Sequence, residues 1–248
     1  MSHPVFQDYT YTKGLTQFQA VSCFNFEYCG NFDIEGPASF ITYSPFKGGP
    51  EVLTSVVGSG TLDVYIGGAM KNKTIASYTA GPSYNNNLPQ VFYGRIKTYI
   101  LTGGNATINI TREIDTFLMS QNVERKGFIA SGEYGKYSNT QDVNDMIQSP
   151  SLSSKIRYNI RSADLQGPVR MVIVERKNAE FLSMKIYNSS NKPVLNSFSE
   201  FYGNSLQVQY TTNGSYNTGF YLDFEISNGS TNGWGAIFAI LFCLFLLP

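Results

Sequence analysis

Residues 206–226 read LQVQYTTNGSYNTGFYLDFEI, and this stretch decides the fold class of the chain. Apolar side chains occupy every second position in both halves of it: Leu206, Val208 and Tyr210, then Phe220, Leu222, Phe224 and Ile226. A period of two is typical of a β-strand with one buried face, and Asn-Gly between two such runs favours a type I′ turn. The stretch therefore predicts two antiparallel strands joined by a turn at Asn213-Gly214.

The first half of the chain carries a looser version of the same pattern. We match the two halves as follows: Gly49-Pro50 with Gly167-Pro168, residues 51–57 with 169–175, 62–65 with 184–187, 75–78 with 195–198, 92–94 with 201–203, 96–101 with 206–210, and 106–110 with 220–226. The turn that corresponds to Asn213-Gly214 is Gly103-Gly104. A repeat on this scale predicts two tandem domains. The alternative is one larger all-β domain whose halves look alike by composition.

We therefore expect an all-β protein of two tandem antiparallel β-sandwich domains of the jelly-roll kind. The expected divisions are a segment 1–35 that belongs to or packs on the first domain, a first sandwich 36–114, a polar connector with the start of the second domain 115–154, a second sandwich 155–227 and a tail 228–248. Helical periodicity is nearly absent. The exception is Thr140 to Ile147, where Val143, Met146 and Ile147 could share one helix face.

Composition excludes several classes of function. Eighteen basic and eighteen acidic residues cancel, so nucleic acid is not an expected partner. The single histidine, His3, cannot supply a Ser-His-Asp or Cys-His system, and too few soft ligands exist for zinc. We expect no metal and no cofactor. Cys23 and Cys29 are left as an even pair outside the tail, and we expect a disulfide between them, with two reduced thiols as the alternative.

Two features indicate the secretory route. Asn-X-Ser/Thr sequons occur at six positions, and the first five are expected to carry glycans: Asn72, Asn105, Asn109, Asn188, Asn213 and Asn228. The stretch from Trp234 to Pro248 is apolar, uncharged and too short for a membrane span. With the small triplet Asn228-Gly229-Ser230 before it, this tail is typical of a glycosylphosphatidylinositol (GPI) signal, and Asn228 is the expected attachment residue.

The expected location is thus the extracellular face of the plasma membrane. That expectation requires a signal peptide upstream of Met1, because residues 1–26 lack a basic start followed by an apolar run. The alternative is a cytosolic chain whose apolar tail acts as a weak membrane anchor.

Candidate ligand-binding residues lie in polar loops. The first half has a long loop that the second half lacks, containing Tyr84, Asn85, Asn86 and Asn87. Tyr134 and Tyr137 flank Gly135-Lys136 in polar surroundings, where exposed tyrosines favour recognition of sugars and proteins. Added loops on a rigid sandwich often carry the specific function.

Paired carboxylates define an enzymatic alternative. Asp223 and Glu225 lie on one face of an expected strand, and two carboxylates suffice for glycoside hydrolase chemistry. An exposed polar face over a buried apolar one explains the same pattern more simply. The acidic residues from Asp142 to Asp145 could ligate a metal, but a solvated loop or helix face is the simpler interpretation.

The second half resembles the later strands of a CUB domain, in the divergent form expanded in nematodes. The residues that carry this resemblance are Met184 to Tyr187, Phe201-Tyr202-Gly203-Asn204, Leu206 to Tyr210 and Gly219 to Phe224, with Leu62 to Gly68 as a looser first copy. The resemblance implies extracellular binding of proteins or glycans through loops, without catalysis, in surface or innate defence. It departs from the family in lacking the usual cysteines, and the acidic calcium position is Ile66 in one copy and Asn188 in the other.

Overall fold

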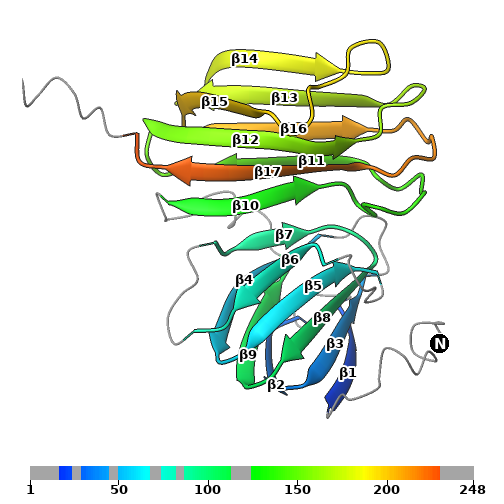
Figure 1. The fold of residues 1–248 in the computed structure, drawn as a ribbon, viewed down its shortest axis with the longest axis vertical. Helices are drawn as coiled ribbons and strands as arrows, with labels where there is room; N and C mark the ends of the chain where they lie inside the picture. The colour runs from blue at the N-terminus through cyan, green and yellow to red at the C-terminus, as the bar shows by residue number, and fades with distance from the viewer. Residues whose placement is uncertain are drawn as a thin grey trace, which may run out of the picture.

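The computed structural model describes residues 17–23, 29–44, 50–67, 74–81, 87–112 and 124–229. These ranges contain strands and no helix, and the strands form two sandwiches that lie one beneath the other (Figure 1). The expected all-β fold of antiparallel β-sandwich domains is confirmed. Within the same ranges, no helix has the length and apolar character that crossing a lipid bilayer requires.

The first domain packs a five-stranded sheet on a four-stranded one. In spatial order the five-stranded sheet is β1 (Gln17–Ser22), β3 (Ala38–Tyr43), β8 (Ile96–Thr102), β5 (Thr61–Ile66) and β6 (Ala76–Thr79). The other sheet is β2 (Asn31–Glu35), β9 (Asn105–Thr111), β4 (Glu51–Gly58) and β7 (Gln90–Phe92). All pairs are antiparallel except β1 with β3. The segment 1–35 thus supplies one strand to each sheet.

The second domain packs two four-stranded sheets. One is β10 (Arg125–Ala130), β17 (Phe220–Ser227), β12 (Ser154–Ala163) and β15 (Phe198–Gly203). The other is β11 (Val143–Gln148), β16 (Ser205–Thr211), β13 (Arg170–Lys177) and β14 (Glu180–Tyr187). β14 forms the outer edge of its sheet and exposes the large apolar side chains of Phe181, Leu182 and Met184.

The two domains share one topology. Strands β2 to β9 occupy, in order, the places that β10 to β17 occupy in the second domain, and β1 is the addition. Our match of the last three strands is therefore right: β7 with β15, β8 with β16 and β9 with β17. The earlier matches are wrong by one strand, because residues 51–57 form β4, whose counterpart is β12 and not the β13 of residues 169–175. Several valine-rich alternating runs resemble each other, so a match by pattern can slip along the chain.

The expected helix at Thr140 to Ile147 is also wrong. Residues 143–148 form β11, in which Val143, Asp145 and Ile147 are buried in alternation. Apolar residues at 143, 146 and 147 fit a helix, but pairing with β16 imposes a period of two. The interpretation of Asp145 as part of a solvated face is wrong for the same reason, since its side chain is buried on the same face of β11 as Val143 and Ile147.

The turn at Asn213-Gly214 forms as expected and opens into a longer loop. Ser215 N donates to the Thr212 carbonyl at 3.0 Å, and Asn213 and Gly214 have φ angles of 51° and 79°. β17 begins only at Phe220, so residues 216–219 are added after the turn. This addition projects Tyr216 from the end of the sandwich.

Each sandwich has its own core, and β10 contributes buried residues to both. The first core includes Phe40, Phe92 and Tyr99, and the second includes Tyr158, Tyr210 and Phe220. Phe128 and Ala130 of β10 pack into the first core, although β10 pairs with β17 of the second domain, and Ile129 between them packs into the second. β10 therefore joins the two cores.

Candidate functional site

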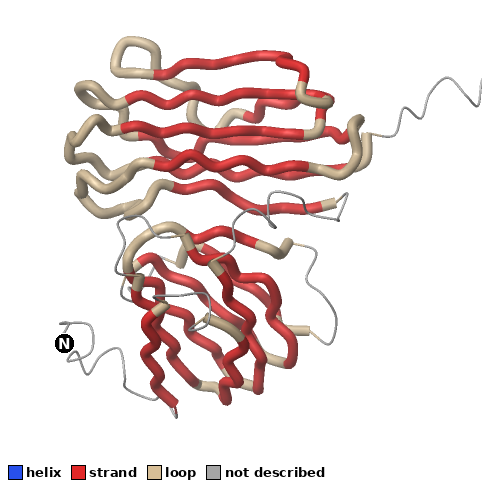
Figure 2. Tube along the Cα trace, turned by 180° about the vertical axis from the view of Figure 1, so that it is seen from behind, coloured by secondary structure: helices blue, strands red, loops and turns tan. Residues whose placement is uncertain are grey.

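The junction between the domains is held by a side-chain amide. β7 and β10 are edge strands of the two domains, and they lie next to each other in views from both sides (Figures 1 and 2). Gln90 Nε2 donates to the Phe128 carbonyl at 2.8 Å, and Phe128 N donates to Gln90 Oε1 at 3.2 Å. The amide thus replaces one peptide group of a β-ladder and joins the two edges.

Further polar contacts fix the same junction. Arg125 donates to the Pro89 carbonyl, and Lys126 N donates to Asn87 Oδ1 at 3.0 Å. Asn87, a predicted ligand-binding residue, therefore bridges the two domains. The other candidates of that loop, Tyr84, Asn85 and Asn86, lie outside the described residues.

An aromatic row continues the junction toward the loops of the second domain. The Phe128 ring stacks on Tyr221 with centroids 5.2 Å apart, and the Tyr134 ring lies 5.4 Å from Tyr221. Ser162 Oγ donates to the Tyr134 hydroxyl at 3.0 Å. Tyr134, expected to be an exposed recognition residue, is thus half-buried and packed against the first core. The junction is consequently apolar as well as hydrogen-bonded.

A buried carboxyl group lies beside this junction. Asp145 is 6% exposed, accepts a hydrogen bond from Met146 N at 2.8 Å, and is hydrogen-bonded by Tyr93 of the first domain. Burial raises the pKa of Asp145 to about 6, opposed by the Met146 amide, the charge of Arg125 and the Tyr93 hydroxyl. The pKa of Tyr93 is raised by its own burial and then by Asp145.

We expect Asp145 to make stability dependent on pH. The pKa of Asp145 in the folded protein lies above its ordinary value. The stability that protonated Asp145 contributes is therefore fully present below about pH 4 and is lost as the pH rises through about 6. Asp145→Asn should remove this decline and make the variant more stable than the wild type at pH 7. Urea unfolding at pH 4, 5, 6 and 7 measures it, and parallel curves for both proteins would contradict the assignment.

A pair of exposed tyrosines marks the loop end of the second domain. Tyr137 is 73% exposed and Tyr216 is 56% exposed, and their ring centroids are 5.6 Å apart. Sequence reasoning selected Tyr137 and missed Tyr216, whose only signal is an aromatic residue in the polar loop after Asn213-Gly214. The structure brings together side chains from two different loops.

The loops that present these tyrosines are braced from inside. Ser138 and Asn217 exchange both backbone hydrogen bonds, at 2.9 and 3.0 Å. Gln141 is fully buried, and its Nε2 lies within hydrogen-bond distance of the carbonyls of Glu133, Lys136 and Asn217 at 3.0, 2.8 and 3.3 Å. A braced loop loses little conformational entropy when it binds, so the pair forms a pre-organised aromatic surface.

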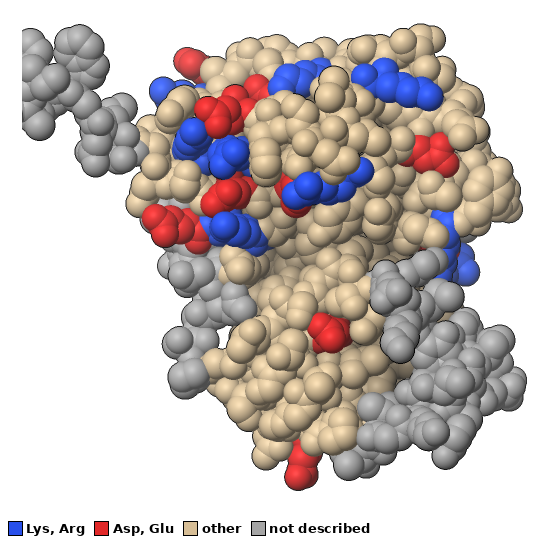
Figure 3. All heavy atoms as spheres, in the orientation of Figure 1, with Lys and Arg blue, Asp and Glu red and all other residues tan. Residues whose placement is uncertain are grey.

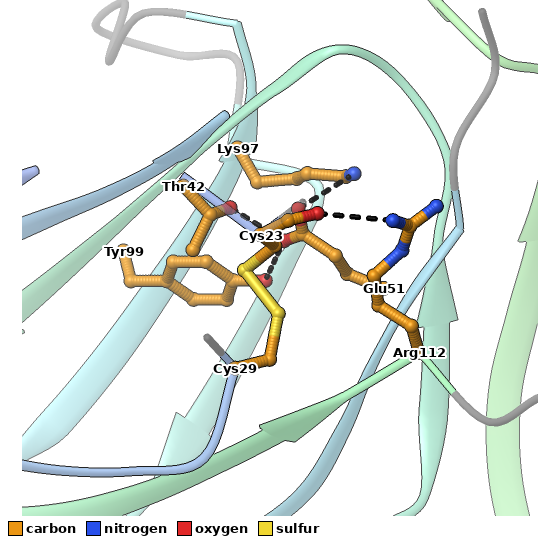
Figure 4. A network of polar contacts seen from close by, with 7 residues as sticks. All are labelled: Cys23, Cys29, Thr42, Glu51, Lys97, Tyr99 and Arg112. Carbon is orange, nitrogen blue, oxygen red and sulfur yellow. Dashed lines mark hydrogen bonds and ion pairs between the residues drawn. A yellow bond between two sulfur atoms is a disulfide. The ribbon is translucent and has the colours of Figure 1, made fainter. Parts of the chain in front are cut away.

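A buried polar cluster anchors the N-terminal part of the first domain (Figure 4). Lys97 Nζ lies 3.2 Å from Glu51 Oε1 with both side chains fully buried, and Thr42 Oγ1 donates to Glu51 Oε2 at 2.5 Å. Burial lowers the pKa of Lys97, and the Glu51 carboxylate opposes that shift. Close by, Arg112 donates to the Cys23 carbonyl at 3.0 Å. This cluster is enclosed and serves the fold.

The two cysteines of the pair are bonded to each other. Cys23 and Cys29 form a disulfide with Cα atoms 5.3 Å apart. Cys23 N also donates to the Tyr43 carbonyl at 3.0 Å, which continues the pairing of β1 with β3. The disulfide therefore links the residue that follows β1, the strand without a counterpart in the second domain, to the residues just before β2 of the first sandwich.

The described sequons lie on the surface of both domains. Asn105 begins β9 on the rim of a shallow depression of about 880 Å³, which Asp33, Glu35 and Thr107 also line. Asn109 lies on the outer face of β9, where its Nδ2 donates to Asn31 Oδ1 at 2.6 Å. Asn188 and Asn213 lie in turns, and Asn213 Nδ2 donates to the Pro168 carbonyl at 2.9 Å. Asn72 lies outside the described residues, as does the tail beyond Gly229.

The carboxylates of the enzymatic alternative lie in an exposed network of ion pairs. Asp223 Oδ2 accepts from Arg161 Nε at 2.6 Å, while Glu225 lies 3.2 Å from Lys126 Nζ and 4.0 Å from Arg157. Basic and acidic groups alternate on this face of the second domain (Figure 3). Cations on neighbouring strands engage both carboxylates, which is the arrangement of a polar sheet face. In the described ranges, no three His, Cys, Asp or Glu side chains gather closely enough to hold a metal ion.

Comparisons with known proteins return matches of limited extent. A family described as "Domain of unknown function (DUF7591)" matches residues 10–113, which span the strands of the first domain and none of the second. No curated protein matches the chain.

Two solved structures are similar at low identity. The CUB1-EGF-CUB2 domain of human MASP-1/3 is 8% identical, with 82% of this chain and all of that chain covered, at a TM-score of 0.33. The infectious bursal disease virus VP2 subviral particle is 9% identical, with 73% of this chain and 56% of that chain covered, at a TM-score of 0.22. Likenesses of this size carry no argument about ligands or activity.

Proposed function

We propose that the chain is a non-enzymatic recognition protein of the cell surface that binds extracellular proteins or glycans. The observation that carries the proposal is the exposed pair Tyr137 and Tyr216 on two loops braced by Gln141. Tyrosine offers a large apolar surface, a hydroxyl group and few rotatable bonds, which suits recognition. The CUB-like character of the strand pattern supports a binding role in surface defence.

The junction explains how two domains could act as one recognition unit. Gln90 and Phe128 connect the edges of both sandwiches, and Tyr134 and Tyr221 extend the contact toward the loop that carries Tyr137. A surface that is fixed relative to both domains keeps its geometry when a ligand binds. We therefore place recognition at the loop end of the second domain rather than at Asn87.

The proposed location is the outer leaflet of the plasma membrane, through a lipid attached at Asn228. The apolar stretch after Trp234, the exposed sequons and the Cys23–Cys29 disulfide support it. Phosphatidylinositol-specific phospholipase C should release the protein from intact cells, and peptide N-glycosidase F should increase its gel mobility. A protein that stays bound after the first treatment would exclude the anchor, and an unshifted band after the second would exclude the glycans.

Binding itself is tested with a tetramer. Residues 1–229, produced through the secretory pathway with an added signal peptide, are tetramerised with a fluorescent label and applied to intact cells. The proposal predicts saturable staining, which prior treatment of the cells with protease or with glycosidases should reduce according to the ligand class. Absence of saturable staining on every cell type that meets the protein would contradict the proposal.

A further inference from the structure

The charged face of the second domain contains a buried polar group at its centre. Asn159 on β12 lies opposite Asp223 on β17 and opposite Phe198 on β15. Its neighbours Tyr158 and Ile160 belong to the core, so Asn159 points to the outer face. Asn159 is nevertheless only 1% exposed. It is therefore buried beneath the side chains of that face rather than inside the sandwich.

Three polar atoms of Asn159 and Asp223 have no hydrogen-bond partner. Neither Oδ1 nor Nδ2 of Asn159 makes a hydrogen bond, and Asp223 Oδ1 makes none either. Asp223 Oδ2, by contrast, accepts from Arg161 Nε at 2.6 Å. Leaving a buried donor or acceptor unpaired costs about 1–3 kcal/mol, so folded proteins rarely keep several together. The group thus offers one amide donor and two acceptors to a molecule that reaches it.

The surroundings of Asn159 suit a neutral molecule with one apolar face. The Phe198 ring is 53% exposed, and the Arg157 guanidinium lies 4.4 Å from its centroid. The positive charges here already face carboxylates: Arg157 Nε lies 3.5 Å from Glu200, although it makes no hydrogen bond, and Arg161 is paired with Asp223. No excess charge is directed at an anionic or cationic ligand.

We propose that Asn159, Asp223 and Phe198 form a binding site for a neutral sugar. Two adjacent hydroxyl groups of a pyranose satisfy all three atoms: one donates to Asp223 Oδ1 and accepts from Asn159 Nδ2, and the other donates to Asn159 Oδ1. The apolar ring face of the sugar then packs on Phe198. The sugar can reach Asn159 if the side chains of Arg157 and Arg161, which are 36% and 45% exposed, shift outward while Arg161 stays paired with Asp223. The inference goes beyond the proposed function, because this site lies apart from Tyr137 and Tyr216 and either can fail alone.

Saturation-transfer difference NMR tests the site with the methyl glycosides of glucose, galactose, mannose and N-acetylglucosamine. At least one should show saturation transfer to its ring protons, and Asn159→Ala should weaken its binding by about tenfold. Asn144→Ala, which removes an exposed asparagine on the other sheet of the same domain, should leave the signal unchanged.

Phe198→Ala provides a second variant whose folding is not at risk, because that ring is exposed, and it should also weaken binding. Circular dichroism verifies that each variant is folded. The proposal is overturned if none of the four glycosides shows saturation transfer, or if the signal persists unchanged in both Asn159→Ala and Phe198→Ala. Either result leaves binding at Tyr137 and Tyr216 untouched, so failure here is distinguishable from failure of the recognition function.

Discussion

Replacing Lys97 with methionine is expected to lower the free energy of unfolding by about 3–5 kcal/mol. Lys97 and Glu51 are both fully buried, with Nζ and Oε1 3.2 Å apart. Methionine keeps most of the side-chain volume but leaves the Glu51 carboxylate without its cation. The hydroxyl groups of Thr42 and Tyr99 still donate to that carboxylate, but neutral hydroxyls do not replace a charge. Urea unfolding followed by circular dichroism measures the loss.

Two controls separate the buried charge from other effects. Lys126→Met removes an exposed lysine that also pairs with a glutamate at 3.2 Å, and it should cost less than about 1 kcal/mol. The double variant Glu51→Gln/Lys97→Met removes both charges and keeps an acceptor for Thr42, so it should recover most of the stability. Equal losses for Lys97→Met and Lys126→Met would show that the buried pair has no special role.

Replacing Gln90 with leucine is expected to cost about 2–4 kcal/mol and to uncouple the two domains. The variant removes both hydrogen bonds to Phe128 and leaves a buried backbone N–H and carbonyl unpaired at the junction. The wild type should unfold in one transition, whereas Gln90→Leu should show two. Hydrogen exchange should locate the weakened amides in β10.

The matched control for this change is Gln209→Leu. Gln209 is an exposed glutamine on the outer face of β16, in the sheet that does not contain β10, and its replacement should change stability by less than about 0.5 kcal/mol. If Gln90→Leu unfolds in a single transition with wild-type stability, the amide bridge does not couple the domains.

Local patterns in the sequence were sufficient for the closing strands of each domain. Alternation in residues 206–226 and the glycines at 103, 104 and 214 are local signals, and the structure confirms the strands and the turns that they predict. The earlier strand matches failed because their order depends on pairing between strands distant in the sequence. β11 was mistaken for a helix because its apolar residues fit both periods until pairing with β16 selected one.

The candidate sites depended on contacts that no local pattern reveals. Tyr137 was predicted from composition, but its partner Tyr216 comes from a loop after a distant strand. Asn87 and Tyr134 looked free because their partners Lys126 and Tyr221 lie in other elements. Asn159 reads as an ordinary polar position of an alternating strand. Only the side chains packed around it show that it is buried without a hydrogen-bond partner.

Staining of intact cells by the tetramer, with the tyrosine pair removed, tests the central claim most directly. Tyr137→Ala/Tyr216→Ala should reduce the apparent affinity at least about tenfold, because exposed aromatic residues often dominate recognition. Phe181→Ala removes an equally exposed aromatic side chain from β14 and should leave staining unchanged. Wild-type staining by the double tyrosine variant, with or without an effect of Phe181→Ala, would contradict the assignment of recognition to this loop end.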